Sequence, residues 1–265
     1  MNIATWNVNS IRMRLNHLLV WLDQNPMDVV CLQETKVVDE QFPRSELEDR
    51  GYHCYCFGQK SYNGVAILSR EKLDQVSYGF EGILGSQIDT AWDQQKRVIA
   101  AVYKEITIVN LYVPNGSSMD SEKYIYKLEW LSILSQYLTH LLAQSDRLHL
   151  CGDFNIAPDD RDIYDSADKQ DHIMASIPER QALRSLLSLG LTDAFRHFYP
   201  DPGHFTWWDY RGGSFRRNLG WRIDHHYVSE ALIPSVLSCE IDRLPRTWDK
   251  PSDHTPVVLT LANLE

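Results

Sequence analysis

Polar side chains that could take part in catalysis or bind a metal lie where the apolar runs of this sequence end or begin. The run RLHLCGDFN ends in Asp153 and Asn155, which are separated by one residue. A single aspartate or asparagine in such a place is typical of a turn. Six runs that are all bounded in this way instead favour one polar cavity at a common edge of the sheets. The other residues of this kind are Asn7 and Asn9, Gln33 and Glu34, Tyr112 and Asn115, Asp224, and Asp253 and His254.

The residue types at these positions suit phosphoryl chemistry assisted by a divalent cation. Asn9, Glu34 and Asp253 offer the hard oxygen ligands that Mg²⁺ and Mn²⁺ prefer, and no cysteine or histidine pair accompanies them to favour zinc. Few ligands are enough, since Mg²⁺ usually keeps several of its waters. A protonated histidine such as His254 can hold a phosphate oxygen, and a second carboxylate can orient its ring. The spacing alone does not say which carboxylate contacts His254.

Strands that alternate with a few helices must position these residues. Because strands outnumber helices and many follow one another in hairpin order, we expect an α/β sandwich of two packed sheets with helices outside. No linker is visible, so residues 1–265 are expected to form one domain, and the polar stretch 159–177 is long enough to be a functional loop. Strands are predicted over residues 1–7, 28–32, 64–69, 98–103, 106–113, 225–229 and 257–261, and helices over 15–25, 122–143 and 178–189.

Composition and charge narrow the class of protein. With 43% hydrophobic and 11% aromatic residues, the 265-residue chain can bury a large core. The N-terminus lacks a signal-peptide pattern and no apolar run reaches about 18 residues, so we expect a cytoplasmic protein with no membrane partner. The five cysteines are interpreted as reduced, mostly buried thiols. The net charge of −10 argues against nonspecific coating of nucleic acid but leaves a nucleic-acid enzyme open.

Eight segments resemble the exonuclease III family of apurinic/apyrimidinic endonucleases, within the endonuclease/exonuclease/phosphatase superfamily. LQETK, GDFN and SDH are typical of the superfamily, and YVPNG and WRID narrow the resemblance to this family. The resemblance implies a four-layer α/β sandwich in which helices flank two packed mixed β-sheets. The segments run along the whole chain in the family's order: ATWNVNSIR (4–12), CLQETK (31–36), NGVAILSR (63–70), NLYVPNG (110–116), CGDFNIAP (151–158), FTWWDYR (205–211), GWRIDHHYVS (220–229) and KPSDHTPV (250–257).

The resemblance also implies which residues bind the metal. Glu34 would be the main ligand, assisted by Asn9 and, directly or through water, by Asp253. Mg²⁺ would be the cofactor, and Mn²⁺ would substitute for it. Asn9 is aspartate in some members of the family, and the asparagine lowers the negative charge of the site. The residues expected at the metal are, in full, Asn9, Glu34, Asp153, Asn155, Asp253 and His254.

The catalytic roles follow from the same resemblance. Asp153 would position or deprotonate the attacking water, and Asn155 would help to hold the phosphate or that water. Two residues apart on an extended chain, the two side chains are expected to point the same way, towards the phosphorus. His254 would hydrogen bond the scissile phosphate, oriented by Asp224. The phosphate site would be completed by Tyr112, Asn115 and Asn7.

The implied substrate is double-stranded DNA with abasic sites or blocked 3′ ends, bound by a monomer. An abasic sugar is cheap to extrude because it lacks the base that would stack and pair. Trp207, Trp221 and Ile223 stand where the family forms the small apolar pocket for this sugar. Four arginines are expected to face DNA phosphates near that pocket: Arg211, Arg216, Arg217 and Arg222. The pair His225–His226 departs from the family, and strand alternation predicts a structural pair with one ring inward and one outward.

The implied activity is incision of the backbone 5′ to an abasic site, leaving a 3′-hydroxyl, together with 3′-phosphatase or 3′-phosphodiesterase and 3′→5′ exonuclease action. Two alternatives remain. A non-catalytic nucleic-acid-binding relative is expected to have lost Glu34, Asp153, Asp224 or His254, and none is lost here. Another phosphoesterase of the superfamily is opposed by YVPNG and WRID. The balance of activities, the number of metals and the choice between Asp153 and His254 as general base stay open.

Overall fold

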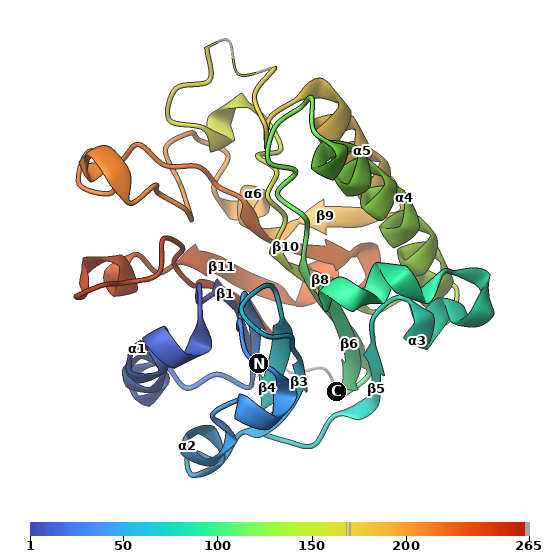
Figure 1. The fold of residues 1–265 in the computed structure, drawn as a ribbon. Coiled ribbons are helices and arrows are strands. Elements are labelled where there is room, and N and C mark those ends of the chain that lie inside the picture. Colours follow the sequence, from blue (N-terminus) through green and yellow to red (C-terminus); the bar gives the residue numbers. More distant parts are fainter. Residues whose placement is uncertain (168, 170, 263–265) are drawn as a thin grey trace.

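The computed structural model describes residues 1–262 except 168 and 170, and two mixed β-sheets form its centre (Figure 1). Over this described part of the chain, each sheet has six strands. The first has the order β11 (Val236–Ile241), β12 (Val257–Leu261), β1 (Asn2–Asn7), β2 (Val29–Gln33), β4 (Val65–Ser69) and β3 (His53–Phe57). The second has the order β5 (Asp74–Tyr78), β6 (Val98–Tyr103), β7 (Ile106–Tyr112), β8 (Leu148–Asp153), β10 (Asp224–Ser229) and β9 (Leu191–Asp193).

Helices cover the outer face of each sheet, and this confirms the predicted four-layer α/β sandwich. α1 (Ile11–Gln24) and α2 (Arg44–Glu48) lie on one side of the molecule, and α4 (Glu122–Leu142) and α5 (Ile177–Leu187) lie on the other (Figure 1). Their apolar stripes supply the buried contacts: Leu18 and Leu22 in α1, and Leu134 and Leu138 in α4. Two further short helices are α3 (Glu81–Leu84) and α6 (Ala194–Phe198). Among the described residues, no helix has the length and apolarity needed to cross a membrane.

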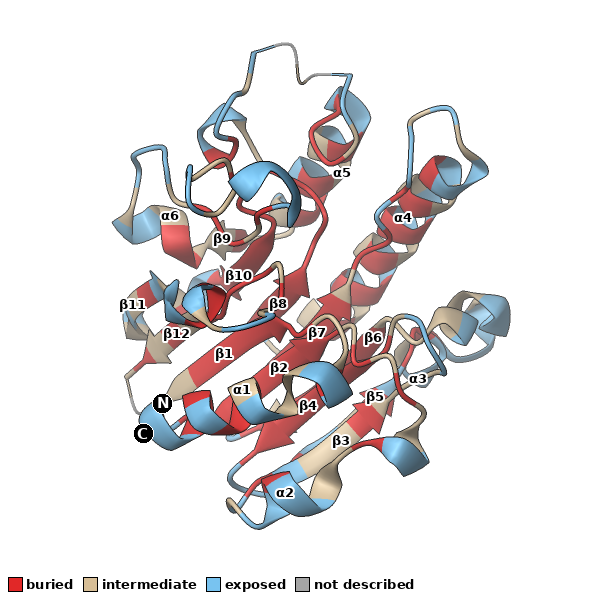
Figure 2. Cartoon of the chain, turned by 60° about the vertical axis from the view of Figure 1, so that its left-hand side comes forward, coloured by how far each residue is buried: buried red, intermediate tan, exposed pale blue. Residues whose placement is uncertain are grey.

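The main core lies between the two sheets. Ile3, Val29 and Ile67 of the first sheet pack with Ile108 and Cys151 of the second. Because helices cover the opposite faces, every residue of β2, β4, β8 and β10 is buried, which Figure 2 shows as continuous red strands. This double burial explains why β2 and β4 appear in the sequence as nearly continuous apolar runs, while β8 and β10 bury His149, His225 and His226 among their apolar residues.

The order of the strands brings their polar ends to one edge. β1 and β2 are parallel, and so are β7 and β8, so each pair ends at the same edge of its sheet. The register places Asn7 beside Gln33, and Tyr112 beside Asp153. β10 is antiparallel to β8 and therefore begins where β8 ends, with Asp224 opposite Asp153. The predicted common edge is thus present in both sheets.

Candidate active site

An asparagine on the first sheet joins carboxylates from both sheets. The Asn7 amide donates one hydrogen bond to Glu34 Oε1 (2.9 Å) and another to Asp153 Oδ2 (2.8 Å). Ligand atoms of Glu34, Asp153 and His254 all lie within 4.8 Å of one another. Glu34 follows β2, Asp153 ends β8, and His254 precedes β12, so three separate strands build this cluster.

His254 lies between two aspartates of the second sheet. Its Nδ1 lies 2.8 Å from Asp224 Oδ2, and its Nε2 lies 3.7 Å from Asp153 Oδ2. Thr206 donates a hydrogen bond from its hydroxyl to the same Asp224 oxygen (2.6 Å) and accepts the backbone N–H of Asp224 (3.1 Å). The geometry therefore resolves the point that spacing left open: Asp224 is the carboxylate that orients the ring.

The pKa values of this buried group are displaced in a way that assigns its charges. Burial lowers the pKa of His254, but the negative charges of Asp224, Asp153 and Asp253 outweigh it and raise the pKa to about 10. Burial is the main reason why the pKa of Asp153 rises to about 7, and the charges of Asp224 and Glu34 add to it. His254 is therefore an imidazolium at neutral pH, while Asp153 titrates near neutrality.

A cation already occupies the space between two of the predicted metal ligands. Lys36 Nζ lies 2.7 Å from Glu34 Oε2 and donates a hydrogen bond to Asn9 Oδ1 (2.5 Å). The two carboxylate oxygens of Asp253 each already accept a hydrogen bond, one from the side-chain amide of Asn9 (2.9 Å) and one from the indole of Trp207 (3.0 Å). The oxygens of Glu34 and Asn9 thus fit a positive ion, and Asp253 holds Asn9 in place.

Unusual backbone geometry aims these side chains. Glu34, Asn9 and Asn155 have φ values of 51°, 44° and 49°, in the left-handed region that most residues other than glycine avoid. Gly152 precedes Asp153 with φ 141°, and a Cβ there would lie 1.9 Å from the carbonyl oxygen of Leu111 on β7. Glycine is therefore required where β8 passes close to its neighbour, just before the end of the strand that carries Asp153.

Asn155 lies beside Asp153, but the reason given from the sequence is wrong. β8 ends at Asp153, and the left-handed backbone at Asn155 means that the chain between them is not extended. The Asn155 amide donates to the carbonyl of Val113 (3.0 Å), and its Oδ1 accepts from the Asn115 amide (3.0 Å). These contacts connect the end of β8 to the loop after β7.

Tyr112 stands beside the same group with its hydroxyl protonated. Burial, with the nearby charge of Glu34, raises its pKa well above the ordinary value. The Arg97 guanidinium stacks on the Tyr112 ring, with its central carbon 4.6 Å from the ring centroid, and donates a hydrogen bond to the Tyr112 carbonyl (3.1 Å). Tyr112 can therefore donate a hydrogen bond to a phosphate oxygen.

An aromatic cavity of about 370 Å³ adjoins the cluster. Trp207 and Trp221 are paired across a β-bridge, and a second bridge joins Trp207 to His254. Ile223 is buried against Trp221 and does not belong to the cavity lining. The lining residues are Tyr164, Lys169, His172, Met174, Trp207, Asp209, Arg211, Gly212, Ser214, Leu219 and Trp221.

Three of the four predicted DNA-facing arginines lie at the surface, and one does not. Arg211, Arg216 and Arg217 are exposed on the loop beside the cavity. Arg222 is only 1% exposed, and it pairs with Asp162 (2.6 Å) and Asp193 (2.7 Å). The prediction for Arg222 was wrong because the two acidic partners lie 60 and 29 residues earlier in the chain.

The prediction that one of His225 and His226 would face outward is also wrong. Both are fully buried, because sheet and helices cover the two faces of β10. His225 Nε2 donates to the carbonyl of Ile156 (3.0 Å), and His226 Nε2 donates to the carbonyl of Val257 (3.0 Å). The two rings do point to opposite faces of β10, as predicted, but both faces are covered: His226 points to Val257 of the facing sheet, and His225 points to the other side.

A buried ion pair behind the site was missed by sequence reasoning. Lys127 and Glu179 have fully buried side chains 2.5 Å apart. The Lys127 ammonium also donates to the carbonyls of Asn155 (2.8 Å) and Asn115 (3.2 Å), so it fixes the two asparagines of the site. The one signal was a lysine four residues before Leu131, on the apolar face of a predicted helix.

Comparison with known proteins agrees with this geometry. The Endonuclease/Exonuclease/phosphatase family model matches residues 4–254. The exodeoxyribonuclease of Bacillus subtilis is 35% identical over 98% of this chain and 99% of its own length, and exodeoxyribonuclease III of Haemophilus influenzae is 34% identical over 97% and 98%. The chain belongs to the Endonuclease/Exonuclease/phosphatase family. The predicted family and the predicted class, a hydrolytic nuclease of DNA repair, are therefore confirmed.

Solved structures support the fold and the class. The Neisseria 3′ phosphatase NExo, bound to a product DNA hairpin, superposes with a TM-score of 0.94 at 41% identity, over 99% of this chain and all of that one. An AP endonuclease from Archaeoglobus fulgidus gives 0.92 at 38% identity, over 98% and 99%. Relatives with this fold thus include both an enzyme named for abasic sites and one named for 3′ phosphates.

Breaking the buried ion pair is expected to be costly. Lys127→Met leaves Glu179 buried without its cation and should lower the free energy of unfolding by roughly 3–5 kcal/mol. The double variant Lys127→Met/Glu179→Met should recover much of this loss, since an apolar pair replaces the ion pair. Denaturant unfolding measures both, with the exposed Lys123→Met on the same helix as control. Equal stability of Lys127→Met and Lys123→Met would contradict the assignment.

Proposed function

We propose that this protein hydrolyses the phosphodiester 5′ to an abasic site in double-stranded DNA and leaves a 3′-hydroxyl. We also propose that it removes 3′ blocking groups and acts as a 3′→5′ exonuclease at the same site. The observation that carries the proposal is the buried group of Asp153, His254 and Asp224 beside Glu34 and an aromatic cavity. The proposal treats residues 1–265 as one domain acting as a cytoplasmic monomer.

Mg²⁺, or Mn²⁺ in its place, is the proposed cofactor. Glu34 and Asn9 would hold it at the position where the Lys36 ammonium now contacts both side chains, with Asp253 orienting Asn9. These are oxygen donors, which suit Mg²⁺ better than they suit zinc. When bound there, the ion would neutralise charge on the scissile phosphate and its leaving oxygen.

The protein groups divide the remaining work of the reaction. Asp153 is the proposed general base that takes a proton from the attacking water, because its raised pKa suits that task at neutral pH. His254 would donate a hydrogen bond from Nε2 to the phosphate as negative charge develops, and Asp224 would keep the ring in place. The phosphate would be held further by Asn7, Tyr112, Asn115 and Asn155.

The aromatic cavity is the proposed site for the extruded abasic sugar. The bridges from Trp207 to Trp221 and to His254 hold the cavity at a fixed position relative to the phosphate group. An undamaged nucleotide would have to place its base in the same space. Arg211, Arg216 and Arg217 would contact the phosphates around the lesion, which lets an acidic chain bind DNA locally.

Substitution of the proposed base tests the reaction. Asp153→Asn keeps the shape of the side chain but cannot accept the proton, so we expect incision of an abasic duplex with Mg²⁺ to fall by about 100- to 10,000-fold. Removal of a 3′-phosphate should fall equally, since both reactions use this base. The exposed Asp74→Asn is the control. Wild-type protein that binds the duplex but never cuts it would instead support a non-catalytic relative.

The pH dependence tests the assignment of acid and base. The enzyme should become active as Asp153 loses its proton near pH 7 and should lose activity as His254 deprotonates near pH 10. A plot of kcat/KM against pH should therefore rise near pH 7 and fall near pH 10. Asp224→Asn removes a charge that raises both pKa values, so both limbs should move to lower pH. Steady-state kinetics from pH 5 upwards measure the shift. A descending limb that does not move would contradict the role of Asp224.

Substitution in the cavity separates the two proposed substrates. Trp221→Leu should lower kcat/KM for abasic incision by roughly 10- to 200-fold, the range for loss of apolar pocket contacts. Removal of a 3′-phosphate should change less, because that reaction needs no extruded sugar. Trp248→Leu, which lies away from the cavity, is the control. An equal loss on both substrates would indicate that the cavity does not discriminate between them.

A further inference from the structure

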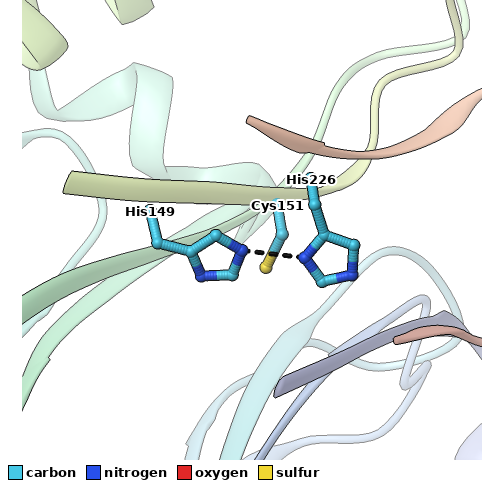
Figure 3. Close-up of side chains that lie close together, drawn as sticks. All are labelled: His149, Cys151 and His226. Carbon is cyan, nitrogen blue, oxygen red and sulfur yellow. Dashed lines mark hydrogen bonds between the residues drawn. The ribbon is translucent and has the colours of Figure 1, made fainter. Parts of the chain in front are cut away.

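A second cluster of ligand side chains lies between the two sheets and takes no part in the proposed reaction. His149 and Cys151 on β8 and His226 on β10 are fully buried, and their side chains converge (Figure 3). One nitrogen of each histidine and the sulfur of Cys151 all lie within 4.8 Å of one another. The imidazole rings are stacked, with centroids 5.0 Å apart and planes 11° from parallel.

Hydrogen bonding fixes which nitrogen of His226 is free to bind a ligand. A carbonyl oxygen only accepts, so the contact of His226 Nε2 with the Val257 carbonyl (3.0 Å) places the proton on Nε2. The lone pair of His226 Nδ1 then faces His149 Nε2 at 2.8 Å. A ring that donates one N–H to a backbone carbonyl and presents its other nitrogen is the usual arrangement of a metal-bound histidine.

The facing sheet supplies a fourth group. Cys31 on β2 of the first sheet packs with Cys151 in the core between the sheets, and its thiol contributes to the raised pKa of Cys151. Cys31 is not among the three residues whose ligand atoms converge, so its side chain would have to turn toward them to serve as a fourth ligand. Two histidines and two cysteines, on three strands that are far apart in the sequence, are then available to one ion. This set of nitrogen and sulfur ligands differs from the oxygen ligands at the edge of the sheets, and it is the set that tetrahedral zinc prefers.

We propose that Cys31, His149, Cys151 and His226 form a structural zinc site between the sheets. On binding, the two thiols would lose their protons to solvent as two Zn–S bonds form, and the proton of His149 Nε2 would move to Nδ1. Two thiolates then balance the charge of Zn²⁺, so the complex is neutral, which is the form that a buried site tolerates best. For tetrahedral geometry the histidine nitrogens must separate from 2.8 Å to about 3.3 Å, a small movement of one ring, and the Cys31 side chain must turn toward the other three ligands.

The strands that would carry this site also carry the catalytic groups. Cys151 lies two residues before Asp153, and His226 lies two residues after Asp224. An ion at this position would cross-link β8 and β10 to the facing β2. Its expected effect is therefore on the stability of the sandwich, and the chemistry at the edge would not need it.

Cobalt substitution tests the site directly in the whole protein. Wild-type protein, unfolded in denaturant and refolded with Co²⁺, should bind one ion that survives gel filtration. It should show the sulfur-to-cobalt charge-transfer absorption of a thiolate complex, which oxygen ligands at Glu34 and Asn9 cannot give. Protein refolded with Zn²⁺ should retain one zinc per chain by mass spectrometry and unfold at a higher denaturant concentration than protein refolded with a chelator.

Variants locate the ion. Cys151→Ser should abolish the charge-transfer band and the retained zinc, while Cys239→Ser, which removes another fully buried cysteine outside the cluster, should keep both. Glu34→Gln should also keep both, which separates this site from the catalytic one. The proposal is overturned if refolded wild-type protein retains no ion and shows no thiolate band, or if Cys151→Ser retains the zinc.

Discussion

The buried contact between His254 and Asp224 is the interaction on which the rest of the site depends. Several carboxylates are crowded at one edge of the sandwich, where burial and mutual repulsion both oppose their charges. One imidazolium, held 2.8 Å from Asp224 and 3.7 Å from Asp153, compensates them. In return, the carboxylates keep His254 protonated. Burial, together with the charges of Asp224 and Glu34, raises the pKa of Asp153 to about 7, so the same group holds one protonated ring and one carboxyl that titrates near neutral pH.

The order of strands makes this charge group possible. Parallel neighbours in each sheet end at the same edge, and β10 runs back so that Asp224 stands opposite Asp153. The polar ends of the strands are then held by covered, apolar sheets on both sides. A loop would not fix carboxylates this closely. The close approach of β8 to β7 requires glycine at position 152, since no side chain fits beside the Leu111 carbonyl.

Much of this arrangement could be predicted from the sequence, because local signals carried it. Continuous apolar runs indicated the inner strands, and polar residues at their ends indicated a shared edge. The outer strands β3, β5 and β11 were missed, since each mixes buried and exposed residues over five or six positions without a clean alternation. The site residues were assigned mainly through the resemblance of their motifs, and the spacing alone could not select Asp224 as the partner of His254.

Contacts between distant residues could not be predicted. Arg222 was expected to face DNA because its partners Asp162 and Asp193 are remote in the chain. Lys127 similarly finds Glu179 only when α4 and α5 pack together. The left-handed backbone at Asn155 was also missed, and the side chain of this residue contacts Asn115 in the loop after β7, 40 residues earlier in the chain. In each case the decisive partner lies in another layer or loop of the fold.

The protonation state of His254 tests the central claim most directly. Nitrogen NMR of the protein with ¹⁵N-labelled histidine, with the His254 signals assigned by their loss in His254→Gln, reports whether both ring nitrogens carry protons. We expect an imidazolium at pH 7 that persists until well above pH 8 in the wild type and titrates at lower pH in Asp224→Asn. A neutral His254 ring at pH 7 in the wild-type protein would contradict the account.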